Sequence, residues 1–161
     1  TAKVQAVSFL SRPPADTRVL LGYVRTVAQY RWIQETHLYN LRADERKGSV
    51  GLHSEQLAAE LVVLYAPDLE RTSLWRVTGY PQLLSRERML ELGYPHPGGT
   101  VYFCLPVEPL DEGTDVVSRL TFRLVAQLAK EIAPDADDGA PIATTWDRLT
   151  GFLAARAATG R

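Results

Sequence analysis

The three histidines and the single cysteine are the side chains of this 161-residue chain best suited to catalysis or metal binding. His37, His53 and His96 lie 16 and 43 residues apart, which matches no local metal-binding motif, and one cysteine cannot form a Cys-x-x-Cys pair. Cys104 stands in an apolar run, where a thiol packs as a small hydrophobic group. The chain also lacks a Gly-x-Ser-x-Gly elbow and the common phosphate-binding glycine loops. We therefore expect no catalytic residue, no metal and no other cofactor.

The segment from residue 42 to residue 51 is the best candidate for a binding surface. Arg42, Arg46 and Lys47 can neutralise phosphate charge, and two glycines in the segment let its backbone approach a ligand closely. We expect these three basic side chains to contact the phosphates of a nucleic acid, either DNA or RNA. The alternative is a solvated hairpin turn, because two acidic residues between them offset most of the charge.

Aromatic residues lie close to this basic segment in the sequence. Trp32 and Tyr39 precede it, and Tyr94 opens a Pro/Gly-rich loop that contains His96. Aromatic rings beside basic side chains are what stacking on a base, or holding it in a pocket, requires. We expect Trp32, Tyr39 and Tyr94 to stack on a base or line its pocket, with His53 and His96 as polar contacts. Large aromatics dominate core burial, so core positions are expected for Trp75, Tyr102, Phe103 and Trp146.

The charge of the chain is balanced in total and uneven along its length. The 18 Lys and Arg and 19 Asp and Glu residues give a net charge of −1. Residues 1–53 hold eight basic and four acidic residues, a net of +4, while residues 54–100 and 101–161 carry −2 and −3. Such asymmetry is typical of a protein with a basic binding face and an acidic opposite part.

The length favours one domain over residues 1–161. Within it we expect a β-rich core with short helices in residues 1–110 and C-terminal helices in residues 111–161 that pack on that core. The lone cysteine, and the absence of an apolar run near the roughly 18 residues that span a bilayer, favour a cytoplasmic protein without a membrane partner.

Apolar patterning in the first half predicts both strands and helices. Residues 3–10 alternate as a strand does, and a helix is expected from about Tyr23 to Leu38, although the alternation over residues 19–23 also fits a strand. Ser54 is expected to cap a short helix. The apolar runs 61–65 and 74–79, separated by a polar turn, predict a hairpin.

A short helix is expected from Ser85, as its cap, to Leu92, with Gly93 ending it. Glu87 and Glu91 lie one turn apart on this helix among arginines, which indicates a salt-bridged exposed face and not a catalytic dyad.

Residues 100–107 form the clearest predicted strand, in which Pro106 marks an edge, a bulge or the end. A helix is expected from Asp115, its cap, through Ile132, because apolar residues recur at helical spacing. A last helix is expected to start at Thr144 or Thr145.

Two runs carry a resemblance to a known superfamily: ELVVLY at residues 60–65 and LWRVTG at residues 74–79. With the short helix, loop and strand that follow, their order resembles the PUA-like superfamily of small β-barrels, which includes EVE, ASCH and YTH modules. The resemblance covers about a third of the chain. It implies an α+β fold with a small mixed β-barrel or curved sheet, flanking helices and a C-terminal helical pair. It also implies a reader that accepts a base, often a modified one, in an aromatic pocket between barrel and helices.

Three functions remain open at the level of the sequence. The first is a nucleic-acid-binding domain without enzymatic activity. The second is a protein-interaction subunit, or a homo-oligomeric module, that uses the amphipathic C-terminal helices. The third is a small hydrolase that acts on a nucleotide or RNA, with His53 or His96 as acid or base.

Overall fold

The computed structural model describes residues 13–42, 54–68, 72–110, 119–136 and 140–159. The strand predicted at residues 3–10 lies outside them. The described strands form one seven-stranded sheet of order β2-β6-β4-β3-β1-β7, with β5 also paired to β6. Its strands are β1 Arg18–Tyr23, β2 Leu38–Arg42, β3 Leu61–Tyr65, β4 Ser73–Val77, β5 Gln82–Ser85, β6 Val101–Pro109 and β7 Ile142–Thr145. The helices are α2 Val27–Thr36, α3 Ser54–Leu57, α4 Arg86–Glu91, α6 Phe122–Ile132 and α7 Trp146–Thr159.

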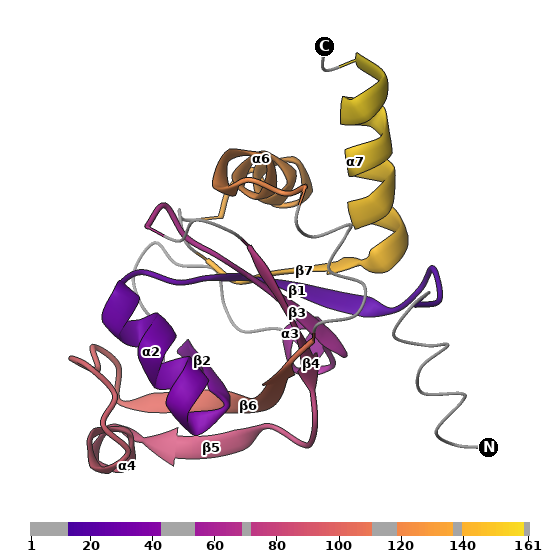
Figure 1. Ribbon diagram of the computed structural model, residues 1–161. Helices are drawn as coiled ribbons and strands as arrows, with labels where there is room; N and C mark the ends of the chain where they lie inside the picture. Colours follow the sequence, from indigo (N-terminus) through magenta and orange to yellow (C-terminus); the bar gives the residue numbers. More distant parts are fainter. Residues whose placement is uncertain (1–12, 43–53, 69–71, 111–118, 137–139, 160–161) are drawn as a thin grey trace.

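The sheet is curled and has helices on both sides. Figure 1 shows α6 and α7 above β7 and β1, while α2 lies below them, beside the part of the sheet formed by β2, β5 and β6. This is the α+β fold with a curved sheet and flanking helices that the resemblance implied.

The central strands β1 and β3 are parallel and are buried on both faces. Val19 and Leu21 of β1 pack in the cluster under α6 and α7, whereas Leu20 belongs to the cluster inside the curl, with residues of α2. Residues of β3 divide between the same two clusters. A strand buried on both faces reads as a continuous apolar run, which explains the sequence LVVLY.

A close contact across the curl joins β2 to β1. The ring of Tyr39 lies against Gly22, where an added Cβ would be 2.9 Å from Tyr39 Cζ and 3.1 Å from Leu64 Cδ2. The Tyr39 hydroxyl donates a hydrogen bond to the Tyr23 carbonyl at 3.2 Å. Because β1 and β2 are not neighbours in the sheet, this contact closes the interior of the curl.

Strand β6 connects the two parts of the sheet. Its first residues pair with β5 and its last three with β4, while β2 pairs along residues 102–106. Pro106 stands at the junction between the β5 and β4 ladders, and its carbonyl accepts from Thr78 N at 2.8 Å. A residue without an N–H is tolerated where a ladder is interrupted. Pro106 thus lies within a strand that changes partners.

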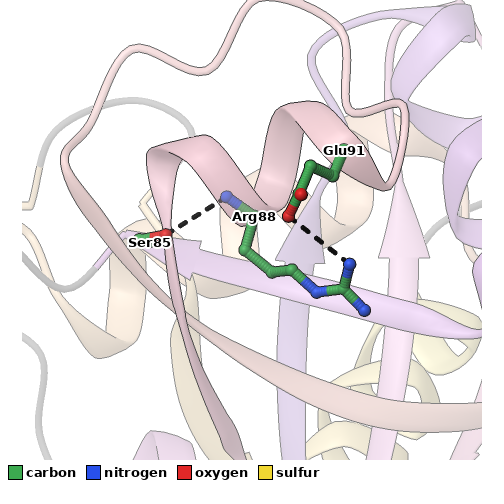
Figure 2. Close-up of polar contacts among 3 residues, drawn as sticks. All are labelled: Ser85, Arg88 and Glu91. Carbon is green, nitrogen blue, oxygen red and sulfur yellow. Dashed lines mark hydrogen bonds and ion pairs between the residues drawn. The ribbon is translucent and has the colours of Figure 1, made fainter.

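The hairpin predicted from residues 61–65 and 74–79 is confirmed by the antiparallel pair β3–β4. The predicted cap of α4 is also confirmed, since the Ser85 hydroxyl accepts from Arg88 N at 3.1 Å (Figure 2). The Arg88 guanidinium pairs with Glu91 at 3.5 Å on the same exposed face. Gly93, at φ +84°, follows the helix in the left-handed region that glycine favours.

The helix expected from Tyr23 to Leu38 is wrong at both ends. Tyr23 ends β1, and α2 covers only Val27–Thr36, with Thr26 as its cap and His37 in the left-handed conformation at its end. The strand interpretation of residues 19–23 was therefore the correct one, because β1 pairs with β3 as far as Tyr23. Strands β2, β5 and β7 carry short or polar-interrupted patterns, and none of them was predicted.

The C-terminal helices cover the sheet. Helix α6 begins at Phe122 with Thr121 as its cap, so the described helix starts later than expected; Asp115 lies outside the described residues. Thr145 caps α7 as expected, because its hydroxyl accepts from Arg148 N. The apolar stripes of both helices pack on the sheet through Val125, Leu128 and Leu149. None of the helices within the described ranges is long and apolar enough to cross a membrane.

Replacing Gly22 with alanine should destabilise the protein, because the new methyl group would overlap the Tyr39 ring and Leu64 in a filled interior. Overpacking of this kind costs about 1–3 kcal/mol. Gly151→Ala is the matched control, since nothing lies within 4 Å of a Cβ there and the residue is an exposed position of α7. It should stabilise the protein by up to about 1 kcal/mol. Urea unfolding measures both, and an unchanged midpoint for Gly22→Ala would contradict the closure described for the curl.

Candidate functional site

Trp32 and Tyr94, two of the predicted pocket residues, are in contact. Their ring centroids are 4.9 Å apart in an edge-to-face arrangement. The ring centroids of Tyr94 and Tyr102 are 5.8 Å apart. Trp32 comes from α2, Tyr94 from the loop after α4 and Tyr102 from β6. We call these three rings the aromatic cluster. Trp32 is only 3% exposed and donates from its indole nitrogen to the Leu92 carbonyl, while Tyr94 is partly exposed.

A chain of amide groups holds the Tyr94 hydroxyl. Asn40 Nδ2 donates to it at 2.9 Å, and Gln29 Nε2 donates to Asn40 Oδ1 at 3.2 Å. The Gln29 amide oxygen in turn accepts from Arg25 N, at the turn before α2. The hydroxyl is thus fixed from α2 and β2 together, so the Tyr94 ring has a defined position beside solvent.

Tyr39, the third predicted aromatic, belongs to the interior. It is 3% exposed, and its ring packs against Gly22 of β1. Burial, followed by the neighbouring Tyr65 and Tyr94, raises the pKa of Tyr39 far above its ordinary value. Burial also raises the pKa of Tyr94 to about 12, and the hydrogen bond from Asn40 opposes that shift. Both hydroxyls are therefore protonated at neutral pH.

The loop after Tyr94 is tied down at several points. The Arg86 guanidinium donates to the carbonyls of Gly98 and Gly99, and Gly99 N donates to the Tyr102 hydroxyl at 2.7 Å. His96 is exposed and has φ +52°, in the left-handed region. This loop forms one rim of the aromatic cluster and presents His96 to solvent.

The predicted basic segment is described only at its start. The backbone of Arg42 ends β2, whereas Arg46, Lys47 and His53 lie outside the described residues. Two further basic residues, Arg25 and Arg31, are exposed at the start of α2 and within it.

A second group of rings, not singled out in the sequence, lies near the end of α2. Trp75 contacts Tyr30 and His37 with centroids 6.5 Å away in each case. Ser73 Oγ accepts from Trp75 Nε1 at 2.8 Å and from the Tyr30 hydroxyl at 3.4 Å. The sequence signal that could have indicated this group is the i, i+7 spacing of Tyr30 and His37 across two helical turns.

Cys104 has the buried environment that its apolar run predicts. It is fully buried in β6, with Sγ 3.7 Å from Met89 Sδ, and burial raises the pKa of the thiol to about 12. A protonated, inaccessible thiol is a poor nucleophile. Across the described ranges, no group of three His, Cys, Asp or Glu side chains is arranged to hold a metal ion.

Comparisons with known proteins give a likeness of fold. No family model and no curated protein sequence matches the chain. Among solved structures, the Mmi1 YTH domain superposes with a TM-score of 0.53 at 8% identity, over 91% of this chain and 80% of that one. The structure titled "YTH domain-containing protein mmi1 and RNA complex" gives the same score and identity over 91% and 88%. The chain thus resembles the YTH domains in its overall fold.

Alkaline pH should unfold the protein through its buried tyrosines. The pKa of Tyr94 is about 12 in the folded protein and about 10 in the unfolded chain. The contribution of Tyr94 to the free energy of unfolding is therefore fully present below pH 10 and is lost as pH rises through about 12. Tyrosinate absorbance, followed together with circular dichroism, should show Tyr39 and Tyr94 ionising only as the fold is lost. Tyr94→Phe should remove one ionisation from that step, and ionisation of Tyr94 in the intact fold near pH 10 would contradict the assignment.

Proposed function

We propose that the protein is a non-enzymatic RNA-binding domain that accommodates a base at the aromatic cluster. The observation that carries this proposal is the YTH-like fold over 91% of the chain, shared with a YTH domain whose structure is titled as an RNA complex. Because fold alone does not specify function, the proposal depends on side chains that could perform the two tasks of binding phosphates and holding a base.

In this proposal, Arg42, Arg46 and Lys47 contact phosphates. They follow directly from the end of β2, the strand whose Asn40 holds the Tyr94 hydroxyl. Arg31 of α2 and Arg25, just before that helix, add positive charge. Phosphate contacts of this kind contribute affinity independent of base sequence.

The aromatic rings contribute the contacts to a base. Tyr94 is partly exposed and held by Asn40, so it offers a ring on which a base stacks without movement of the core. Trp32 supports the Tyr94 ring from the interior at a centroid distance of 4.9 Å, and Tyr39 packs deeper, against Gly22; each is only 3% exposed. His96, exposed in the same rim, and His53 supply polar contacts to the base or its sugar. The proposal covers an unmodified or a modified base.

The phosphate contacts can be tested by removing three positive charges. The variant Arg42→Ala/Arg46→Ala/Lys47→Ala should bind a fluorescent single-stranded RNA at least about tenfold more weakly in anisotropy titrations at low salt. Its salt slope should fall by about 2, since each phosphate contact on a single strand contributes about 0.7.

The matched control removes three arginines from the helices on the opposite side of the sheet, as Arg123→Ala/Arg148→Ala/Arg156→Ala. This control removes the same number of positive charges. If it loses as much RNA affinity as the first variant, the loss reflects the overall charge of the protein and not contacts made by Arg42, Arg46 and Lys47. If the parent protein binds neither RNA nor DNA at low salt, the proposed function is wrong.

The stacking role of Tyr94 can be separated from its hydroxyl contact. Tyr94→Leu should weaken RNA binding by about 1–3 kcal/mol, or about 5- to 150-fold, because base stacking is lost. Tyr94→Phe keeps the ring and should retain most of the affinity. Tyr80→Leu is the control, since Tyr80 is 92% exposed and lies outside the cluster. If Tyr80→Leu weakens RNA binding more than Tyr94→Leu does, the base does not stack at the aromatic cluster.

A further inference from the structure

A cavity of about 320 Å³ lies between α6 and the ends of the central strands. Tyr23 and Tyr65 come from the ends of β1 and β3, Phe122 begins α6, and Ile142 begins β7. Tyr65, Phe122 and Ile142 belong to the apolar cluster on the α6 and α7 side of the sheet, whereas Trp32 and Tyr94 belong to the cluster on the other side. The cavity therefore lies on the other side of the sheet from Trp32 and Tyr94, and the Arg25 guanidinium, 5.9 Å from the Tyr23 ring centroid, stands between the two sites.

Three aromatic rings form a continuous wall of this cavity. Tyr23 meets Tyr65 at 5.5 Å and Phe122 at 6.1 Å, both edge to face, and Tyr65 and Phe122 are 5.9 Å apart with planes inclined by 33°. Rings in these arrangements leave edges and faces that a further planar ring can contact favourably.

The space exists because the opposite wall consists of alanines. Ala126 and Ala129 of α6, then Ala133, Ala136 and Ala140, present only methyl groups to the three rings. Larger residues at these positions would fill the volume, as side chains fill nearly all of a protein interior. An apolar cavity of about 150 Å³ already accepts one aromatic ring, and ligand pockets begin at about 300 Å³. The volume here is enough for two rings.

The cavity has a buried floor and an accessible rim. Tyr65, Ala136 and Ile142 are buried, whereas Phe122 and Ala129 are partly exposed. A ligand can thus enter beside α6 and cover apolar surface that water otherwise contacts.

The charges near the cavity favour an uncharged ligand. Lys130 is the only charged side chain among the described lining residues; it is exposed, and it donates from Nζ to the Ala136 carbonyl at 3.2 Å. Asp135, which adjoins the lining residue Ala136, is exposed and acidic, which disfavours an anion. No acidic side chain lines the described wall to pair with a cation.

We propose that this cavity is a binding site for an uncharged, planar aromatic molecule of one or two rings, held between the Tyr23, Tyr65 and Phe122 rings and the alanines of α6. The ligand is apolar, because it replaces water on hydrocarbon and ring surfaces. The ligand and RNA contact different aromatic residues, since the cavity lies on the other side of the central strands from Trp32 and Tyr94.

The test uses 6-propionyl-2-(dimethylamino)naphthalene, an uncharged two-ring dye whose fluorescence rises in apolar surroundings. We expect saturable binding of one dye per chain to the 161-residue protein. Ala129→Leu places a larger side chain in the cavity and should weaken binding at least tenfold without lowering thermal stability. The control Leu83→Ser/Leu90→Ser removes two exposed apolar residues, 61% and 55% exposed, on β5 and α4, and should leave dye binding within twofold of the parent.

A measurement on the parent protein keeps the test independent of whether Ala129→Leu folds. In methyl spectra, the signals of Ala126, Ala129 and Ala133 should shift on dye addition, while that of Ala59, buried on the other side of the sheet, should not. The proposal is overturned if the dye does not saturate, if the control variant and not Ala129→Leu loses binding, or if the shifts fall on Ala59. Displacement of the dye by equimolar adenosine would overturn the apolar class of ligand. RNA affinity of Ala129→Leu should equal that of the parent, so failure here and failure of the RNA proposal are distinguishable.

Discussion

The packing of the Tyr39 ring on Gly22 is the constraint on which the rest of the structure depends. Four steps of strand pairing separate β2 from β1 in the sheet, through β6, β4 and β3, yet the ring joins them directly. The sheet must curl for this to happen, and β1 must carry a residue without a Cβ at the point of contact. Gly22 is needed here for space and not for an unusual backbone angle, because only a hydrogen fits between the Tyr39 ring and Leu64. The buried hydroxyl is satisfied by the Tyr23 carbonyl, so the closure leaves no polar group unpaired.

The curl divides the interior into two clusters that share the central strands. Alternate residues of β1 and β3 face the aromatic cluster side and the α6 side, so each side is supported by the same backbone. A ring at the end of β1, Tyr23, lines the cavity under α6, and its carbonyl accepts from Tyr39 on the other side. The doubly buried strands therefore place the cavity directly, whereas the aromatic cluster takes its rings from α2, the loop after α4 and β6.

The elements predictable from sequence are those whose patterns are local. The β3–β4 hairpin and the Ser85 cap each depend on a few adjacent residues, and both are confirmed. The boundary between β1 and α2 was missed because the contact that requires a strand at Tyr23 comes from Tyr39, on a later strand. Strand β7 pairs with β1 across more than a hundred residues of chain, and its sequence IATT carries no apolar alternation. Long-range pairing of this kind leaves no signal in a short window.

The candidate site illustrates the same limit for side chains. Trp32, Tyr39 and Tyr94 are equivalent as residue types near a basic segment, but only Tyr94 is partly exposed. What distinguishes it is the amide pair Gln29–Asn40, which comes from α2 and β2 and fixes its hydroxyl. At 8% identity to the YTH domains, a shared fold reflects the pattern of buried strands and says nothing about individual side chains. For the proposed binding of a base, Tyr94 and Asn40 are therefore stronger candidates than Tyr39, which the fold already uses to close the curl.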